Sequence, residues 1–511
     1  MVIARTIPSI SYQEYPQEPI ALETVSIRFM KQSMFVPLDI TGDVLKVAMA
    51  DVNDYATMDA LKVAYRTEIE VVKGKPEDIL DVIEKLYGSG RQSIENIIEE
   101  ADRDVYGAQG GDSDDIAHLK DMASEAPIIR LVNRLIVSAV EIRASDIHFE
   151  PFDRKFQVRY RIDGVLHEAE TPPPRLQAAI ISRVKIMAKL DIAERRLPQD
   201  GSIKLKIADR DIDFRVSTIP TIYGESLVMR ILDRESLVMD LKQLGFPDDI
   251  LVKYHELIRQ PYGMILVTGP TGSGKTSTLY TTLDLINSME TKIITLEDPV
   301  EYQLSGVNQI QVNTKTGMTF SRGLRSIVRQ DPDVILVGEI RDGETAQIAI
   351  QSALTGHLLF STLHTNDSAG AITRLLDMGV EHFLLSSTLL GIMAQRLVRV
   401  ICPKCKAPAE PDPRRLKLMN LTDGEAENVV FYEGRGCEYC HNTGFRGRIA
   451  IFEYLPVNEL IRKEIIRRSD TDEIKRVAKT MGVRTLREDG WRKVKEGVTT
   501  LAEVLRVTLE V

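Results

Sequence analysis

The sequence predicts a multidomain α/β protein, and three observations support this prediction. Four apolar residues, Met264 to Val267, are typical of a buried parallel strand, and the Gly-rich stretch GPTGSGKT follows at once. From about residue 244 to residue 400, strand-like runs alternate with helical ones, as in a sheet that is covered by helices. A chain of 511 residues is also long enough for about three or four domains, each with its own core.

The composition is that of an ordinary water-exposed protein, with 43% hydrophobic and 27% charged residues. The 65 basic and 75 acidic residues give a net charge of −10, which disfavours a non-specific nucleic-acid binder because such proteins normally carry a basic face. The sequence contains neither a run of 18 apolar residues nor the apolar core of a signal peptide. We therefore expect a cytoplasmic protein that reaches a membrane only through a partner.

The N-terminal part of the chain contains no catalytic pattern. Residues 1–23, with three prolines, are expected to form an extended arm. Residues 24–88 alternate strand-like and helical patterns and predict a small α/β docking domain. Residues 89–117 are poor in apolar side chains and include YGAQGGDSDD, which predicts a flexible linker.

Residues 118–243 predict a second, α+β domain. It begins with a helix whose apolar residues recur at helical spacing, and the alternation from Phe156 to Tyr160, closed by Asp163-Gly164, predicts a hairpin. Arginines inside its strand-like runs have two open interpretations: a solvated strand face, or groups that point at a nucleotide phosphate held by the next domain. These residues are Arg159, Arg161, Arg215 and Arg230.

The stretch GPTGSGKT matches the pattern G-x-x-x-x-G-K-[ST] completely and indicates a phosphate-binding loop. Its glycines allow a tight turn in which backbone amides converge on phosphate oxygens, and the following helix adds its dipole. Lys275 is expected to reach the β- and γ-phosphates, and Thr276 to ligate Mg²⁺. The predicted nucleotide-binding residues are Gly269, Pro270, Thr271, Gly272, Ser273, Gly274, Lys275 and Thr276.

Acidic residues follow the next two strands of residues 244–400, the predicted nucleotide-binding domain. Glu297, Asp298 and Glu301 come at the carboxyl end of the first, where they could position Mg²⁺ or its waters; an acidic turn that caps a helix is the alternative. The second strand, Val334 to Val337, ends in Gly338-Glu339. We expect Glu339 to orient or deprotonate the attacking water, and its share in Mg²⁺ binding stays open.

Two of the eight histidines, His357 and His364, lie on either side of the strand-like run LLFSTL. Both are candidate catalytic residues, although a lone histidine is more often structural, and this alternative applies mainly to His357. His364 follows the carboxyl end of the strand, at the level of the phosphates in such a sheet. A neutral imidazole there could sense the γ-phosphate.

All four cysteines, Cys402, Cys405, Cys437 and Cys440, form two C-x₂-C pairs within residues 401–441. The segment between the pairs is longer than the usual ~15–20 residues. Doubling a loop costs only about 0.6 kcal/mol, against roughly 10–16 kcal/mol from structural zinc, so the spacing is compatible with a Cys₄ zinc site. A redox dithiol pair is the alternative. Residues 442–511 are expected to form a C-terminal helical region.

Four segments of residues 244–400 resemble, in order, the Walker A, Asp-box, Walker B and His-box motifs of the secretion ATPase superfamily. They are GPTGSGKTSTLY, ITLEDPVEY, RQDPDVILVGEIRD and TGHLLFSTLHTNDS. ASDIHFEP, AERRLPQDG and GESLVMRIL resemble the domain that precedes the motor. With the cysteine insert and the N-terminal domain, the chain is similar over about residues 24–511 to the type II secretion traffic ATPases, the general secretion pathway protein E family. Retraction-type pilus motors lack both of these added parts.

The resemblance implies a homo-hexameric ATP hydrolase with a RecA-like P-loop motor domain after a PAS-like α+β domain. By motif position, Arg215 and Arg230 would face the phosphates. The N-terminal domain would bind the cytoplasmic region of an inner-membrane secretion protein. Through an inner-membrane platform protein, the motor would drive pseudopilus assembly and the export of folded proteins across the outer membrane. The alternatives are a type IV pilus assembly ATPase, a RecA-like nucleic-acid motor, and a nucleotide-gated scaffold.

Overall fold

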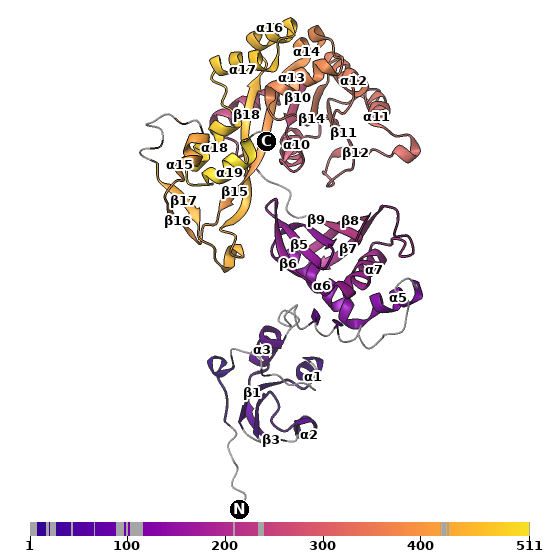
Figure 1. The fold of residues 1–511 in the computed structure, drawn as a ribbon, viewed down its shortest axis with the longest axis vertical. Helices are drawn as coiled ribbons and strands as arrows, with labels where there is room; N and C mark the ends of the chain where they lie inside the picture. The colour runs from indigo at the N-terminus through magenta and orange to yellow at the C-terminus, as the bar shows by residue number, and fades with distance from the viewer. Residues whose placement is uncertain are drawn as a thin grey trace, which may run out of the picture. The chain divides into compact units, whose positions relative to one another are not determined.

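The structure is a computed structural model that describes residues 8–16, 20, 27–41, 44–65, 67–87, 97–98, 101–102, 116–207, 210–233, 240–419, 421, 426 and 429–509 (Figure 1). The chain divides into two compact units, residues 1–135 with 172–184, and residues 136–171 with 185–511. Much of the predicted arm and most of the predicted linker over 89–117 lie outside the described residues. Within the described ranges, no helix has the length and apolar character that a membrane span requires.

The first unit contains a small three-stranded sheet, ordered β1-β2-β3, with β1 antiparallel and β3 parallel to the central strand. Phe35, Val47, Leu61 and Ile79 are fully buried and belong to one core that joins the sheet to its helices. This is the small α/β fold that the alternating patterns predict. The elements that lie entirely within the first unit are η1 (Tyr12–Glu14), α1 (Ile27–Gln32), β1 (Phe35–Thr41), β2 (Val44–Met49), α2 (Tyr55–Tyr65), β3 (Glu68–Lys73), α3 (Pro76–Tyr87), α5 (Ile116–Ser124) and η2 (Pro174–Leu176). The unit boundary passes through α6 (Ala126–Glu141) and α7 (Gln177–Met187).

The second unit begins with a six-stranded antiparallel sheet in the order β6-β5-β4-β9-β8-β7. The predicted hairpin is confirmed: β5 and β6 are joined at Asp163-Gly164, and both residues have positive φ, as a tight hairpin turn requires. The strands are β4 (Ala144–Pro151), β5 (Phe156–Ile162), β6 (Val165–Glu170), β7 (Gln199–Ile207), β8 (Arg210–Thr221) and β9 (Gly224–Asp233).

A seven-stranded sheet in the order β12-β11-β13-β14-β10-β15-β18 forms the centre of the second unit, and helices flank it (Figure 1). Only the pairing of β15 with β18 is antiparallel. Met264 and Leu266 pack into the core under α11 to α14, whereas Ile265 and Val267 pack into the core under α8 to α10. Because β10 is buried on both faces, it is apolar at successive positions.

The strands of this sheet are β10 (Gly263–Thr268), β11 (Ile293–Glu297), β12 (Val307–Gln311), β13 (Val334–Val337), β14 (Leu358–Leu363), β15 (Leu389–Ile401) and β18 (Phe445–Pro456). The flanking helices are α8 (Leu241–Leu244), α9 (Asp248–Leu257), α10 (Lys275–Ile286), α11 (Phe320–Ile327), α12 (Gly343–Leu354), α13 (Ser368–Asp377) and α14 (His382–Thr388), and η3 spans Thr314–Thr316.

The C-terminal region differs from the prediction in one respect, because residues 442–511 are not wholly helical. They begin with β18, which completes the large sheet against β15 and is buried along residues 450–455. Helices start only at Glu459 and are capped by side chains such as Asp470 and Thr485. The remaining elements are β16 (Lys406–Ala409), α15 (Pro413–Leu418), β17 (Phe431–Gly434), η4 (Glu438–Cys440), α16 (Glu459–Arg467), α17 (Thr471–Thr480), α18 (Leu486–Lys495) and α19 (Leu501–Thr508).

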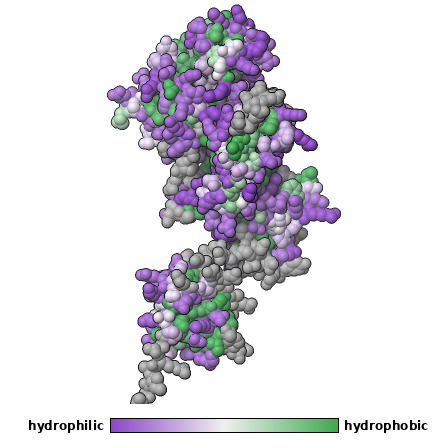
Figure 2. Space-filling view, turned by 90° about the vertical axis from the view of Figure 1, so that its left-hand side faces the viewer, coloured by the Kyte–Doolittle hydropathy of each residue, from purple (hydrophilic) through white to green (hydrophobic). Residues whose placement is uncertain are grey.

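On the face shown in Figure 2, hydrophilic residues cover most of the described area, and hydrophobic residues form smaller patches between them. Many apolar side chains of the second unit are buried in the cores on the two faces of the large sheet, and others in a third core around Trp491.

Candidate functional site

The predicted phosphate-binding loop lies between the end of β10 and the start of α10. Gly269 and Gly274 have positive φ, and a Cβ on either residue would come within 3 Å of Gln395 in the neighbouring strand β15. Only glycine can therefore adopt the backbone turn and the close approach at these two positions. The hydroxyl of Ser273 is buried and lacks a hydrogen-bond partner among the described residues, so it is free to donate to a phosphate oxygen.

Lys275 is the first residue of α10, and its ammonium group is held by the loop itself. Nζ donates to the backbone oxygens of Gly269 and Pro270 at 2.7 and 3.1 Å. Burial lowers the pKa of Lys275 to about 8, although the carboxylate of Glu339 opposes this shift. A phosphate at the loop would stabilise the charged lysine, so the residues present fit a nucleotide phosphate. Thr276 follows in the helix and is exposed.

Glu339 lies directly after β13, at the same edge of the sheet as the loop. Its Oε1 accepts a hydrogen bond from Arg341 at 2.5 Å, and its Oε2 lies 3.1 Å from Nε2 of His364, which follows β14. Burial opposes ionisation of Glu339, but Arg341 and His364 outweigh it and hold the pKa of this carboxyl below its usual value. The structure thus joins Glu339 and His364 as neighbours, and it adds Arg341, which sequence analysis missed although it lies in the same motif.

The three carboxylates after β11 are placed differently from one another. Glu297 is only 4% exposed and accepts hydrogen bonds from Tyr280, Thr295 and Gln309. Asp298 is exposed. Glu301 forms an ion pair with Arg215, at 3.1 Å from Nη1. Of the three acids predicted to position Mg²⁺ or its waters, one therefore faces inward, one is exposed and one holds an arginine.

Of the four candidate arginines of the six-stranded sheet, Arg215 is the one whose described contacts reach the P-loop domain. Besides Glu301, it contacts the backbone oxygen of Val300, to which Nη2 donates at 3.0 Å. The others pair with carboxylates of their own sheet: Arg230 with Asp146 at 3.0 Å, Arg161 with Asp146 at 3.6 Å, and Arg159 with Glu150 at 2.6 Å.

His357 and His364 lie at opposite ends of β14. They flank a strand of six residues and are therefore seven positions apart, which at a rise of about 3.3 Å per residue is roughly 23 Å. His357 lies at the amino end, where its Nδ1 is 2.8 Å from the backbone oxygen of Ser352. The structure therefore brings His364 to Glu339 and keeps His357 away from it.

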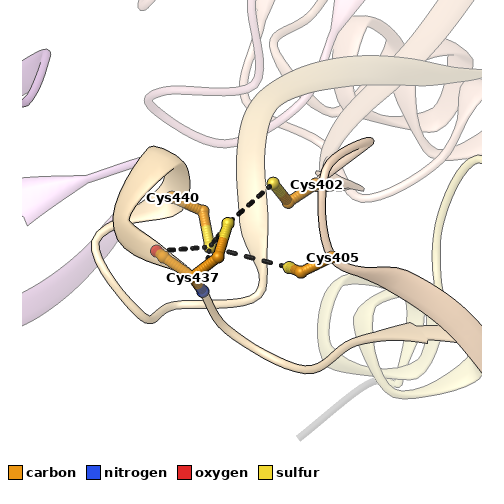
Figure 3. A group of neighbouring side chains, drawn as sticks. All are labelled: Cys402, Cys405, Cys437 and Cys440. Atoms are coloured by element: carbon orange, nitrogen blue, oxygen red, sulfur yellow. Dashed lines mark hydrogen bonds between the residues drawn. The ribbon is translucent and has the colours of Figure 1, made fainter.

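The four cysteines form a compact cluster, in which the two C-x₂-C turns face each other (Figure 3). Sγ of Cys402 lies 3.9 Å from that of Cys437, Sγ of Cys405 lies 3.8 Å from that of Cys440, and all four sulfurs lie within 4.8 Å of one another. A tetrahedral zinc ion with Zn–S bonds of about 2.3 Å requires sulfurs about 3.8 Å apart. The cluster could therefore hold a metal ion, and four sulfur ligands leave no open position for catalysis.

Known proteins resemble this chain over most of its length. The family model described as type II/IV secretion system protein matches residues 121–506, and the MshEN domain model matches residues 6–93. Type II secretion system protein E of Xanthomonas campestris pv. campestris is 50% identical over 487 residues, which is 95% of this chain and 85% of that protein.

Two further proteins extend the comparison. The type IV pilus assembly ATPase PilB of Myxococcus xanthus is 44% identical over 501 residues, covering 98% of this chain and 88% of that protein. Among solved structures, the Legionella pneumophila ATPase DotB superimposes with a TM-score of 0.54 at 20% identity, covering 73% of this chain and 94% of that one. The match to DotB supports the fold alone.

Proposed function

Because the chain belongs to the type II/IV secretion system protein family, we propose that it is the ATPase motor of a type II secretion system, powering export of folded proteins through pseudopilus assembly. One observation carries the chemistry: the P-loop, Glu339 with His364, and Glu301, which holds Arg215, all follow the carboxyl ends of parallel strands of one sheet. That edge is where α/β sheets bind their ligands. The 50% identity to a type II secretion protein over 95% of the chain supports the choice of machine.

Residues 269–276 would bind the ATP phosphates, with Lys275 on the β- and γ-phosphates and Thr276 on Mg²⁺. The metal ion would neutralise charge on the phosphates when bound. Asp298 and Glu301, at the end of β11, would position it or its waters.

Glu339 would orient or deprotonate the attacking water. Its two oxygens contact Arg341 and His364, one each, and every carboxylate oxygen has a second lone pair that could accept the proton of the water. His364, whose Nε2 lies within hydrogen-bond distance of Glu339, would sense whether the γ-phosphate is present. For His357, the contact with Ser352 supports the structural alternative.

Arg215 would act as an arginine finger, in its own subunit's site or in that of a neighbouring subunit. Its present partner, Glu301, keeps the guanidinium at the edge of the P-loop domain, and a phosphate would compete for it. Arg230 is the second candidate and would first have to leave Asp146. A site shared between subunits requires an oligomer, and the family resemblance implies a homo-hexamer.

The remaining parts would serve assembly. Zinc in the Cys₄ cluster would hold residues 401–441 together, since the reduced cytosol preserves the thiols and the ligand set is all sulfur. Residues 24–88 would bind the cytoplasmic region of an inner-membrane protein, which would place the motor at the inner face of that membrane. The domain that contributes the arginines would comprise residues 118–243, the motor domain residues 244–400, and the C-terminal region residues 442–511.

The test compares Glu339→Gln with Lys275→Ala in the full-length protein. Glu339→Gln should keep ATP binding and lower turnover by about 10²–10⁴, because an amide cannot accept the proton. Lys275→Ala should weaken ATP binding itself. ATP binding is measured with a fluorescent analogue and turnover by phosphate release. Unchanged turnover in Glu339→Gln would indicate a nucleotide-gated scaffold instead of a motor.

A second candidate, the type IV pilus assembly ATPase, is favoured by the 44% identity to PilB over 98% of the chain. Tagged full-length protein, purified from native lysate, should retain a type II secretion inner-membrane protein, and a version lacking residues 1–115 should not. Recovery of pilus-assembly components would favour the second candidate and leave the motor chemistry unchanged. Stimulation of hydrolysis by single-stranded DNA would instead favour a nucleic-acid motor.

A further inference from the structure

Tyr280 is a buried tyrosine of the P-loop helix to which the nucleotide chemistry assigns no role. It lies four residues after Thr276 in α10, so the two side chains leave the same side of the helix. The residue is 2% exposed, and its ring packs edge-on against Tyr302 with centroids 6.1 Å apart. Burial and the neighbouring Glu297 raise its pKa above the usual value, so the hydroxyl keeps its proton.

The hydroxyl of Tyr280 joins the helix to the end of β11. It donates a hydrogen bond to Oε2 of Glu297 and lies 3.4 Å from the backbone N–H of Glu301, which donates to it. The other carboxylate oxygen of Glu297 accepts from Thr295 at 2.5 Å and from Gln309 at 3.3 Å. Because both oxygens have donors and the carboxylate is buried, Glu297 is a fixed anchor for Tyr280.

Residues 298–301, which follow β11, also contact Arg215. The backbone N–H of Glu301 contacts Tyr280, while its carboxylate pairs with Arg215 at 3.1 Å. Arg215 also donates to the backbone oxygen of Val300 at 3.0 Å. Residues 298–301 therefore connect the tyrosine of the P-loop helix with the candidate arginine finger.

We propose that Tyr280 is a positioning residue: its hydroxyl fixes the loop of residues 298–301, and with it Arg215, relative to the helix that carries Thr276. The inference rests on the proposed function, because it matters for catalysis only if ATP phosphates bind at that helix. Displacing a catalytic group by about 1 Å can cost about 10²-fold in rate. A single hydroxyl that sets this position should therefore affect turnover more than nucleotide binding.

The experiment removes this hydroxyl by Tyr280→Phe and compares the variant with a matched control, Tyr254→Phe. Tyr254 of α9 is fully buried, and its hydroxyl lies 2.8 Å from the hydroxyl of Thr282 in α10, the helix that also carries Tyr280. Tyr280→Phe removes the hydrogen bond to Glu297 and the longer ones from Glu301 and Gln309, whereas Tyr254→Phe removes the one with Thr282. Both variants should lower the melting temperature, Tyr280→Phe by more, because its lost partners include a buried carboxylate. Tyr280→Phe should lower kcat at least about 10-fold, with KM for ATP and ATP binding within about 2-fold, by the same positioning argument. Tyr254→Phe should leave all three within about 2-fold of the wild type.

A double-mutant comparison separates positioning from general destabilisation. In an Arg215→Ala background, Tyr280→Phe should lower kcat much less than it does alone, because the group that it positions is gone. Equal losses in both backgrounds, or a loss no larger than that in Tyr254→Phe, would overturn the proposal.

Hydrogen exchange gives a readout that does not depend on turnover. Tyr280→Phe should speed amide exchange at residues 298–302, and Tyr254→Phe should not. Unchanged exchange there overturns the positioning role. Faster exchange in a protein whose wild type fails to hydrolyse ATP would support the positioning contact and refute the proposed function instead.

Discussion

Glu503 joins the last helix to the central sheet through a buried ion pair, and its replacement by glutamine should destabilise the C-terminal region. The side chain is 2% exposed. Its carboxylate accepts from Arg399 of β15 and from Arg506 of its own helix, both at 2.7 Å, and from the backbone N–H of Arg399 at 3.2 Å. Glu503→Gln keeps the shape and removes the charge that these groups share.

The size of the effect follows from the pKa of Glu503. Burial opposes ionisation, but the guanidinium groups of Arg399 and Arg506 outweigh it and lower this pKa from 4.5 to about 2. A difference of about 2.5 pH units corresponds to about 3 kcal/mol. We therefore expect Glu503→Gln to lower the free energy of unfolding of this region by about 3 kcal/mol at pH 7.

The pH dependence has a defined sign. Because the pKa of Glu503 is lower in the folded state, its stabilisation is fully present above pH 4.5 and is lost as the pH falls toward 2. Wild type and Glu503→Gln should therefore differ most at neutral pH and converge as the pH decreases below 4.5. Other carboxylates titrate in both proteins, so only the difference between the two reports Glu503.

The single tryptophan, Trp491, provides the assay, because it shares a core with Val504 and Leu505 of α19. Its fluorescence during urea unfolding follows this region separately from the rest of the chain. Glu496→Gln is the matched control: Glu496 pairs with Arg492 at 3.0 Å on the surface, and such a pair is worth only about 0.3–0.5 kcal/mol. A Glu503→Gln effect no larger than the control's, or one that stays constant down to pH 3, would refute the reasoning.

Further predictions concern the nucleotide and cysteine sites. Arg215→Ala should lower turnover by about 10³ or more while ATP binding persists, and equal loss of both would argue against a finger role. If neighbouring subunits share the site, specific activity should rise with protein concentration; a flat dependence would contradict sharing. Purified protein should contain about one zinc per chain, and Cys437→Ser should reduce this content. Cys437→Ser should also lower the temperature at which Trp491 becomes exposed, because Phe431 of β17, the strand just before Cys437, packs against the tryptophan with ring centroids 6.0 Å apart. An unchanged unfolding temperature after removal of the metal would contradict a structural role.

Local patterns were sufficient to predict several parts of this protein. The P-loop was predictable because its backbone turn, its lysine and the buried strand before it all lie within residues 264–276. The α/β class followed from apolar runs that the structure buries on both faces of the sheet. The cysteine cluster followed from two short C-x₂-C turns, since each turn brings its own two sulfurs together. In each case the signal depends on neighbours in the chain.

Only the tertiary structure decided which charged groups meet. Arg215 and Arg230 are directly opposite each other on β8 and β9, yet Arg230 is paired with Asp146 of β4, its neighbour on the other side. The cross-strand neighbours of Arg215 are Ser202 and Arg230, and its guanidinium pairs instead with Glu301, 86 positions along the chain.

The acidic edge and the C-terminal strand show the same limit. Glu297 faces inward because its carboxylate accepts hydrogen bonds from Tyr280 of α10 and Gln309 of β12. Residues 445–456 form the strand β18 because they pair with the edge of β15. The sequence by itself determined the loop, the strand-helix alternation and the cysteine pairs, whose geometry is set by adjacent residues. The tertiary structure decided the partners of each charge, because strand order and register bring together residues whose spacing along the chain carries no periodic signal.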